Sequence, residues 1–257
     1  MKKIQLLLLA LLLSMPFNIW AQSTLRGDVN GDNEVNVADI NAVIDIIMGV
    51  SESDWVDLGL PSGTIWATRN VGAFKAEDYG DYFAWGEIEK KSYYDLSNYK
   101  WYKSDDNDSG YTKYCCSSYD GYDEFTDGKK ELDKADDAAI VNWDTNDHVI
   151  MPTYVQIQEL VDNCTWQWTQ RNGVNGKLGT GPNGNTIFFP AAGFRDTRSS
   201  VQQAGQECRY WSRTLYYFHT YGAYHMFMSA GGQGHNYMRR ECGLTVRPVR
   251  APQVLLP

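Results

Sequence analysis

The chain has 257 residues, of which 23 are Lys or Arg and 32 are Asp or Glu, so its formal net charge at pH 7 is -9. Hydrophobic residues make up 43% of the chain and aromatic residues 14%, a composition typical of a folded globular protein and not of a disordered one. The acidic balance disfavours nucleic acid and anionic membranes as main partners, because both bind basic patches.

Residues 1–21 have the features of a secretory signal peptide. Two lysines precede an apolar run that ends at Leu13, and the small residue Ala21 follows it. A membrane span needs about 20 consecutive apolar residues, and Pro16 interrupts this run. We therefore expect a protein that is secreted or held at the cell surface, with no membrane span after the signal peptide is cleaved.

Residues 28–39 match the ligand spacing of an EF-hand calcium loop, whose oxygen ligands fall at positions 1, 3, 5, 7, 9 and 12. The predicted ligands of Ca²⁺ at these positions are Asp28, Asn30, Asp32, Glu34, Asn36 and Asp39. An apolar pattern at helical spacing follows from Ile40, and Gly49 ends it. The sequence predicts a calcium loop followed by one helix; the alternative is a solvated acidic turn that happens to precede a helix.

The letters GDVNGD at residues 27–32 and NVAD at residues 36–39 resemble the dockerin repeat. We place a dockerin-like calcium-binding repeat at residues 22–50. The resemblance implies docking onto a cohesin-like module in assemblies that degrade polysaccharides. Dockerins carry two such repeats, whereas the segments beginning at Asp105 and Asp144 lack the later oxygen ligands, so we find one.

From Trp55 onward, short apolar and aromatic runs are separated by Gly, Asn and Asp, which is typical of short strands. The predicted strands are residues 56–60, 64–67, 82–85, 186–189 and 223–228. One predicted helix is capped by Asp133 and ends near Trp143. A second follows a capping box from Thr153 to Gln156, and its apolar stripe comprises Val155, Ile157, Leu160 and Val161. Two helices among many short strands indicate an α+β fold of short antiparallel strands.

Several motifs in this region are similar, in order, to the Fibrobacter succinogenes major paralogous domain. They lie at residues 56–63, 66–68, 70–72, 79–87, 136–139, 151–153, 189–193, 210–212 and 246–249. The resemblance spans residues 55–250 and leaves residues 251–257 as a C-terminal tail. It implies an exported bacterial protein with a C-type-lectin-like architecture and no established activity. That architecture pairs its first and last strands, which places residues 56–60 beside residues 244–249.

The residues give no positive sign of catalysis. His148, His219, His225 and His235 do not have the spacing of metal ligands on a helix, and loop or strand histidines are the simpler interpretation. Carboxylate pairs of hydrolases are recognised by their separation in space, which a sequence does not give. We expect a protein that is not an enzyme; if it does catalyse a reaction, a glycan-acting hydrolase is the alternative.

The cysteines are compatible with an exported protein, but they do not define which residues form disulfides. Cys115, Cys116, Cys164, Cys208 and Cys242 are five in number, so at least one is unpaired within the chain. Neighbouring Cys115 and Cys116 do not have the separation that a disulfide needs. A bridge between Cys208 and Cys242 across the aromatic C-terminal region is one option, and buried free thiols are the other.

Aromatic residues are the remaining candidates for ligand binding. Trp166 and Trp168 alternate with polar residues, so they share one face of a strand, and Tyr216 and Tyr217 begin a stretch rich in Tyr and His. Flat aromatic faces stack on sugar rings, whereas the alternative is that these rings fill the core. We predict a lectin-like binding or surface-interaction domain directed at a carbohydrate such as a cell-surface glycan, with a component of a polysaccharide-degrading assembly as the alternative.

Overall fold

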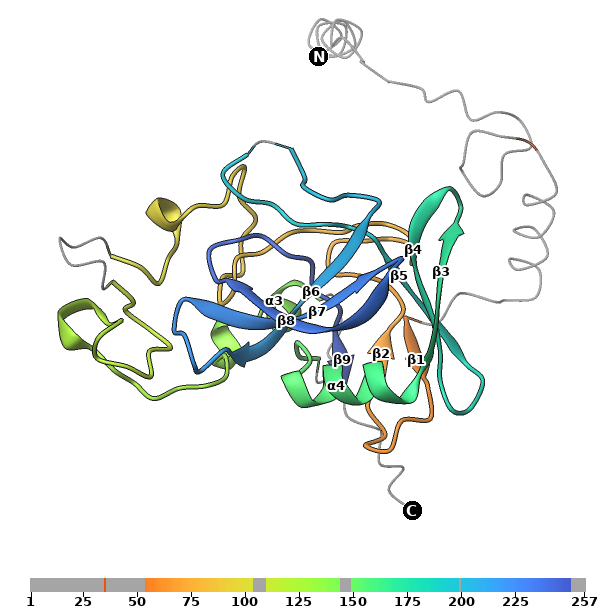
Figure 1. The fold of residues 1–257 in the computed structure, drawn as a ribbon, viewed down its shortest axis with the longest axis horizontal. Coiled ribbons are helices and arrows are strands. Elements are labelled where there is room, and N and C mark those ends of the chain that lie inside the picture. Colours follow the sequence, from red (N-terminus) through yellow and green to blue (C-terminus); the bar gives the residue numbers. More distant parts are fainter. Residues whose placement is uncertain (1–34, 36–53, 104–109, 144–148, 199, 251–257) are drawn as a thin grey trace, which may run out of the picture. The chain divides into compact units, whose positions relative to one another are not determined.

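The computed structural model of the protein describes Val35 and residues 54–103, 110–143, 149–198 and 200–250 (Figure 1). The chain divides into two compact units, residues 1–52 and 53–257. Apart from Val35, the description therefore concerns the second unit. The predicted signal peptide, calcium repeat and C-terminal tail lie outside the described residues. Within those residues, no helix has the length and apolar character to cross a bilayer.

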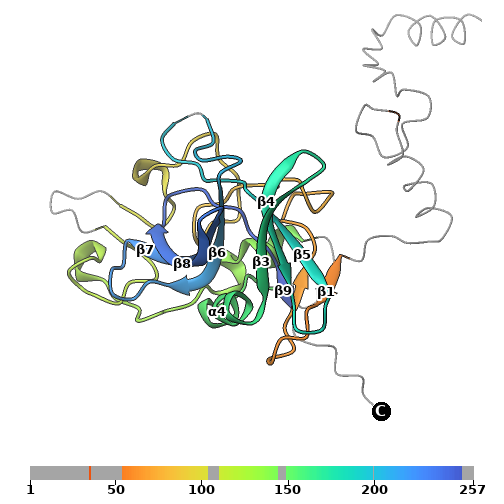
Figure 2. The ribbon, with the colours of Figure 1, turned by 45° about the vertical axis from the view of Figure 1, so that its right-hand side comes forward.

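The second unit is α+β, as predicted, and consists mostly of short antiparallel strands in three small sheets with few helices (Figures 1 and 2). The first sheet has the order β1 (Trp55–Asp57), β2 (Ile65–Ala67), β9 (Val249–Arg250). The second has the order β3 (Thr165–Arg171), β4 (Val174–Thr180), β5 (Thr186–Pro190). The third has the order β6 (Glu207–Leu215), β7 (Gly222–Ser229), β8 (Gly232–Arg239).

The first sheet joins the two ends of the second unit, but not by the direct pairing that we expected. β2 lies between β1 and β9, with Trp66 opposite Val56 on one side and Val249 on the other. The expected pairing of the first and last strands is therefore wrong. A tight turn, in which Gly63 N donates to Leu60 O at 2.8 Å, reverses the chain after β1. β2 thus pairs with β1 as a local hairpin, and the last strand adds to the free edge of β2.

Two of the predicted strands differ from the structure. The strand expected at residues 56–60 ends at Asp57, whose Oδ1 accepts a hydrogen bond from Gly59 N at 2.8 Å, and Gly59 has φ 69°. Residues 82–85 form no strand; Phe83 makes one isolated bridge with Leu244. All four side chains of this segment are buried, so it lacks the alternation of a strand with one solvent face. The strands expected at residues 64–67, 186–189 and 223–228 are confirmed.

The second predicted helix is confirmed as α4 (Tyr154–Asn163). Thr153 Oγ1 accepts a hydrogen bond from Gln156 N, and Gln156 Oε1 accepts one from Thr153 N, which is the predicted capping box. Ile157 and Leu160 are buried, but Val155 is 68% exposed and does not belong to the apolar stripe. α4 packs against β6, β7 and β8 (Figures 1 and 2).

The first predicted helix is shorter than expected and has a different cap. A 3₁₀ turn at Lys134–Asp136 precedes α3 (Ala138–Asn142). The cap is Asp137, whose Oδ1 accepts from Ala139 N and Ile140 N and also from Met151 N. Asp133, the predicted cap, binds lysine side chains instead. Two further 3₁₀ turns occur at Leu96–Asn98 and Tyr122–Glu124.

A fully buried arginine joins the sheets at the centre of the unit. Arg247 donates to Asn70 Oδ1 at 2.7 Å, to the carbonyl oxygens of Ala67 and Thr68 at 3.1 Å each, and to Phe188 O on β5 at 3.1 Å. Burial lowers the pKa of its guanidinium to about 10, so the charge persists at neutral pH. A buried charge is tolerated only when it is paired or hydrogen-bonded in this way.

Candidate functional site

A continuous group of aromatic rings occupies one end of the third sheet and the start of α4. We call it the tyrosine–histidine surface, and its members are Tyr154, Tyr216, Tyr217, Phe218, His219, Tyr221, Tyr224, His235 and Tyr237. They come from the first residue of α4, the connection between β6 and β7, and the strands β7 and β8. The group therefore assembles from segments more than 80 positions apart in the sequence.

The strand register places part of this surface on one face of the sheet. Tyr224 of β7 lies directly opposite Tyr237 of β8, and directly opposed residues share a face. His235 lies two positions before Tyr237, so it points to the same side. Tyr154 Oη and His235 Nε2 are 3.2 Å apart, a hydrogen bond that fixes the start of α4 to β8.

The rings hold one another in place. The rings of Tyr216 and Tyr237 are stacked with centroids 4.1 Å apart and planes 2° from parallel. Tyr224 meets Tyr216 edge-on at 5.0 Å and meets Tyr154 at 4.2 Å. Offset and edge-on pairs of this kind add about 0.5–1.5 kcal/mol each beyond the area that they bury. The surface is therefore built before any ligand arrives.

A glycine makes the stacked pair possible. A Cβ at Gly222 would lie 3.0 Å from Cδ2 of Tyr237, which is closer than ordinary contact. The same residue closes the connection between β6 and β7, because Tyr216 N donates to Gly222 O at 3.0 Å and Gly222 N donates to His219 O at 2.9 Å. The turn thus brings Tyr216 back over β8.

Much of this aromatic surface is open to solvent. Tyr217 is 47% exposed, Phe218 63%, Tyr221 37% and Tyr237 38%. Contiguous exposed apolar patches on soluble proteins mark sites that bind another molecule. Desolvation and a hydrogen bond with Tyr237 raise the pKa of Tyr221, and desolvation raises the pKa of Tyr224, so both phenols keep their protons at neutral pH. The surface offers flat faces together with hydroxyl donors.

The structure separates the two pairs of aromatic residues that the sequence analysis singled out. Tyr216 and Tyr217 belong to the tyrosine–histidine surface. Trp166 and Trp168 lie on β3 in another sheet, half-buried against a core cluster that includes Ile157 and Leu160 of α4. Trp166 Nε1 donates to Val161 O at 3.1 Å, which ties this ring to the end of the helix. The two tryptophans therefore act mainly as packing residues, and the two pairs do not form one site.

Sequence reasoning missed the contributions of Tyr154, His235 and Tyr237. Tyr154 directly follows the capping residue Thr153, and at this position it reaches β8. Tyr237 belongs to the strand Gly232–Arg239, whose glycines and polar residues give no strand pattern. The sequence does show a high density of Tyr and His between residues 216 and 237. This density defines a surface only when the strand register is known.

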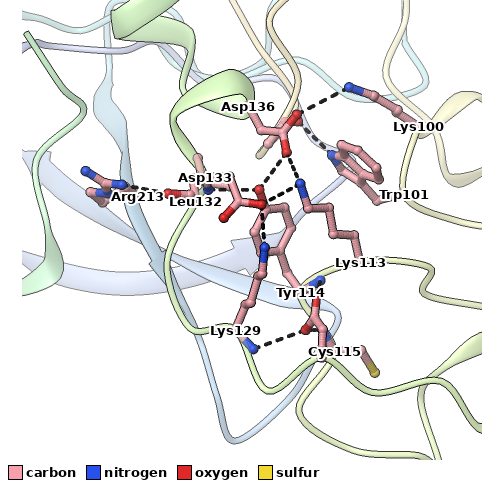
Figure 3. A network of polar contacts seen from close by, with 12 residues as sticks. Lys100, Trp101, Lys113, Tyr114, Cys115, Lys129, Leu132, Asp133, Asp136 and Arg213 are labelled. Carbon is pink, nitrogen blue, oxygen red and sulfur yellow. Dashed lines mark hydrogen bonds and ion pairs between the residues drawn. The ribbon is translucent and has the colours of Figure 1, made fainter.

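A second candidate is the polar network in Figure 3, centred on Asp136. The carboxylate of Asp136 accepts hydrogen bonds from Lys113 Nζ and from Tyr114 Oη, the latter at 2.7 Å, and Lys100 Nζ lies 3.4 Å away. Tyr114 Oη in turn accepts a hydrogen bond from Asp133 N at 3.0 Å. The network connects the 3₁₀ turn before α3 to the segment around Lys113.

Electrostatics indicate that this network is structural. Burial opposes ionisation of Asp136, but the hydrogen bonds from Lys113 and Tyr114 outweigh it and hold the pKa of the carboxyl below its usual value. Burial likewise opposes the charge on Lys113, but hydrogen bonds to Asp133 and Asp136 outweigh it and raise the pKa of the ammonium. A general acid or base needs a pKa near the working pH, so this ion pair is not suited to proton transfer.

The cysteines are free thiols, so of the two options no bridge joins Cys208 and Cys242. Cys208 lies in the core cluster with Phe189 and Tyr210, whereas Cys242 lies in another cluster with Trp85 and Trp211. Burial raises the pKa of each of these two thiols to about 12. Thiols in this state are poor nucleophiles, because the thiolate is the reactive form.

The predicted metal ligands Asp28, Asn30, Asp32, Glu34, Asn36 and Asp39 lie outside the described residues. Across residues 54–103, 110–143, 149–198 and 200–250, no group of three or more His, Cys, Asp or Glu side chains is arranged to hold a metal ion. The calcium site therefore stays a prediction from the sequence. His148 also falls outside the described part, while His225 is fully buried and His219 and His235 are exposed.

No protein-family model, no curated protein and no solved structure matches this chain.

Proposed function

We propose that this is an exported bacterial protein that binds carbohydrate without turning it over, through the tyrosine–histidine surface of a C-type-lectin-like domain. The observation that carries the proposal is the contiguous, solvent-open group of mutually packed rings with protonated phenol tips. Apolar faces of sugar rings stack on such rings, and their hydroxyls pair with phenols and imidazoles. The resemblance to the Fibrobacter succinogenes major paralogous domain supports the bacterial and exported parts of the proposal.

Two structural features support this assignment over a role in packing alone. The rings are fixed by contacts among themselves, so a ligand would not have to order them, and preorganisation of this kind favours affinity. Tyr217, Phe218, Tyr221 and Tyr237 are also more than a third exposed, which a role in packing alone does not explain.

A glycan array probed with the mature chain tests the proposal. We expect binding to at least one glycan class and a loss of about ten-fold in affinity for Tyr217→Ala or Tyr237→Ala, which corresponds to ~1.4 kcal/mol. Tyr119→Ala is the matched control, because Tyr119 is 88% exposed and lies outside the surface. Absence of binding to every glycan would refute the proposal, and release of sugar from a bound glycan would favour a glycan-acting hydrolase.

We further propose that residues 22–50 bind Ca²⁺ through Asp28, Asn30, Asp32, Glu34, Asn36 and Asp39. The support is the oxygen at each ligand position of the loop and the helix pattern that follows. Calorimetry of the mature chain with CaCl₂ should show binding heat that Asp28→Ala or Asp32→Ala abolishes. Asp45→Ala, which removes a carboxylate outside the ligand positions, should retain it. No heat in the unaltered chain would refute the site.

A second candidate function follows from the same repeat. The dockerin-like pattern favours a component of a polysaccharide-degrading assembly that docks on a cohesin-like module through residues 22–50. Immobilised cohesin modules should then retain the mature chain in calcium and release it in chelator, and Asp32→Ala should prevent retention. Retention that is independent of both calcium and Asp32 would contradict docking through the repeat.

A further inference from the structure

A lysine that forms no ion pair within the described part of the chain lies beside the most exposed tyrosine of the proposed binding surface. Lys130 is exposed, and its Nζ is 5.1 Å from the ring centroid of Tyr217. Its carbonyl oxygen accepts a hydrogen bond from Leu215 N at 2.8 Å, which fixes the backbone of Lys130 where β6 ends. Among the described residues, no ion pair involves Lys130. Its ammonium is therefore available to an incoming anion.

An arginine lies at another edge of the same surface. Arg239 ends β8 two positions after Tyr237, so the two side chains share a face of the sheet. Its side chain is 59% exposed, and its charge acts on the phenol of Tyr221. Its Nε donates to Glu241 Oε1. The exposed end of the guanidinium keeps donors in the fork geometry that binds carboxylates.

The glutamates nearest in sequence to these two cations form ion pairs with arginines. Glu241 forms an ion pair with Arg239, and its side chain is only 7% exposed. Glu131, next to Lys130, lies 3.6 Å from Arg213 Nε. The chain as a whole carries a net charge of -9, so the positive charge beside these exposed rings is opposite in sign to the net charge of the protein. This arrangement is complementary to a ligand that carries both apolar faces and negative charge.

We propose that the ligand of the tyrosine–histidine surface is an acidic polysaccharide, whose uronate carboxylates bind Lys130 and Arg239 while its sugar rings stack on Tyr217, Tyr221 and Tyr237. A neutral glycan would use the rings and leave the Lys130 ammonium and the exposed end of the Arg239 guanidinium without a ligand carboxylate. This inference rests on the proposed carbohydrate binding and specifies its substrate class.

The test compares soluble fragments of polyuronates with the same fragments after their carboxyl groups are reduced to alcohols. Polygalacturonate, polymannuronate and polyglucuronate provide three ring stereochemistries. We expect the mature chain to bind at least one acidic form about five-fold or more tightly than its reduced form at low salt. Because exposed charges are screened over about 10 Å at 0.1 M salt, added NaCl should reduce this difference.

Variants separate the charge contribution from the ring contribution. Lys130→Gln should weaken binding of the acidic form several-fold and leave binding of the reduced form unchanged. Lys134→Gln is the matched control, because Lys134 is exposed and lies on the 3₁₀ turn before α3, outside the tyrosine–histidine surface. Arg239→Lys keeps the positive charge and the partner of Glu241 but removes the fork, so it should cost less than Lys130→Gln. Thermal melts check that each variant is folded.

The outcomes distinguish the inference from the function on which it rests. Equal binding of acidic and reduced fragments, or binding of neutral glycans only, would refute an acidic polysaccharide as the ligand. Carbohydrate binding itself would then still stand. Loss of affinity in Lys134→Gln equal to that in Lys130→Gln would overturn the specific role of Lys130. Failure to bind any fragment or any array glycan would overturn both the inference and the proposed function.

Discussion

Two regions of the molecule are rich in tyrosine and use it in opposite ways. The buried tyrosine cluster comprises Tyr82, Tyr94, Tyr99 and Tyr111. In it, Tyr82 Oη donates to Ala192 O and Tyr99 Oη donates to Trp85 O, each at 2.6 Å. In the tyrosine–histidine surface, contacts between rings hold the side chains, and several phenols face solvent. A tyrosine whose hydroxyl bonds the backbone stabilises the fold, whereas one that is held by ring contacts, with its hydroxyl at the surface, can serve a ligand.

The largest expected effect is the loss of the arginine that joins the buried cluster to the rest of the unit. Arg240 is fully buried and donates to Tyr99 Oη at 3.0 Å, Tyr114 O at 3.2 Å, Thr220 O at 3.0 Å and Lys113 O at 2.9 Å. Arg240→Met should lower the free energy of unfolding by about 4 kcal/mol, because each buried acceptor without a donor costs about 1–3 kcal/mol. Urea denaturation measures this loss.

Arg198→Met is the control for that substitution, since Arg198 has an exposed side chain that bonds its neighbour Asp196. It should change the free energy of unfolding by less than about 0.5 kcal/mol. Equal effects of the two substitutions would contradict the structural role that we assign to Arg240.

The histidines provide the next contrast, because His225 is fully buried while His235 is exposed. Within the described residues, neither ring nitrogen of His225 has a hydrogen-bond partner, and burial lowers the pKa of this imidazole from 6.5 to about 3. The unfolded chain therefore binds a proton that the folded chain does not, in the window between these two values. Above pH 6.5 this group does not affect the free energy of unfolding. As the pH falls below 6.5, the free energy of unfolding decreases by up to about 1.4 kcal/mol per pH unit.

Urea denaturation between pH 8 and pH 4 measures this dependence in the unaltered protein and in His225→Leu. The leucine variant should lose less stability on acidification, by about 2–3 kcal/mol at pH 4.5. At pH 8 the imidazole is neutral in both states, so values there serve as the reference for each protein. Parallel pH profiles for the two proteins would show that the burial of His225 does not set the acid sensitivity.

A smaller effect compares the same chemical change in the two tyrosine regions. Tyr99→Phe removes a donor from Trp85 O and an acceptor from Arg240 Nε, so it should destabilise the protein by about 1–3 kcal/mol. Tyr237→Phe should change stability by less than about 0.5 kcal/mol, because this hydroxyl is at the surface. It should instead weaken glycan binding. Equal losses of stability from Tyr99→Phe and Tyr237→Phe would contradict the distinction between the two regions.

The smallest expected effect comes from Gly222, which admits the ring of Tyr237. Gly222→Ala places a methyl group 3.0 Å from Cδ2 of Tyr237, so the ring must shift and its stacking on Tyr216 must weaken. We expect a stability loss of about 1 kcal/mol or less, a change in the near-ultraviolet circular dichroism of the tyrosines, and weaker glycan binding. Gly231→Ala is the control, since its Cβ would lie 3.7 Å from the nearest atom, Ser229 Oγ.

Local signals in the sequence predicted the elements that local contacts determine. The capping box of Thr153 and Gln156 defined the start of α4, because both of its hydrogen bonds lie within four residues. The choice between Asp133 and Asp137 as the cap of α3 was not local. Asp133 is engaged by Lys113, 20 positions away, and Asp137 is fixed by Met151, 14 positions away.

The candidate site depended even more on distant contacts. Tyr216 and Tyr217 were found from their place in an aromatic stretch. Trp166 and Trp168 were found from their alternation with polar residues, but they lie against the core. Alternation along a strand shows that two side chains share a face, and it does not show whether a helix covers that face. The two tryptophans pack against a core cluster whose members come from positions between 58 and 249, so no single segment shows this contact.

The three-stranded sheet β1–β2–β9 has a mechanical consequence. β1 and β9 both run antiparallel to β2, with Trp55 at one end of β2 and Arg250 at the other, and the guanidinium of Arg250 lies 4.5 Å from the Trp55 ring. A force that pulls the two ends of this unit apart therefore acts along the strands. It loads their hydrogen bonds together in shear, so they do not open one after another as in peeling. A tether at either end would leave the tyrosine–histidine surface, which β6 to β8 and α4 build, outside the path of the load.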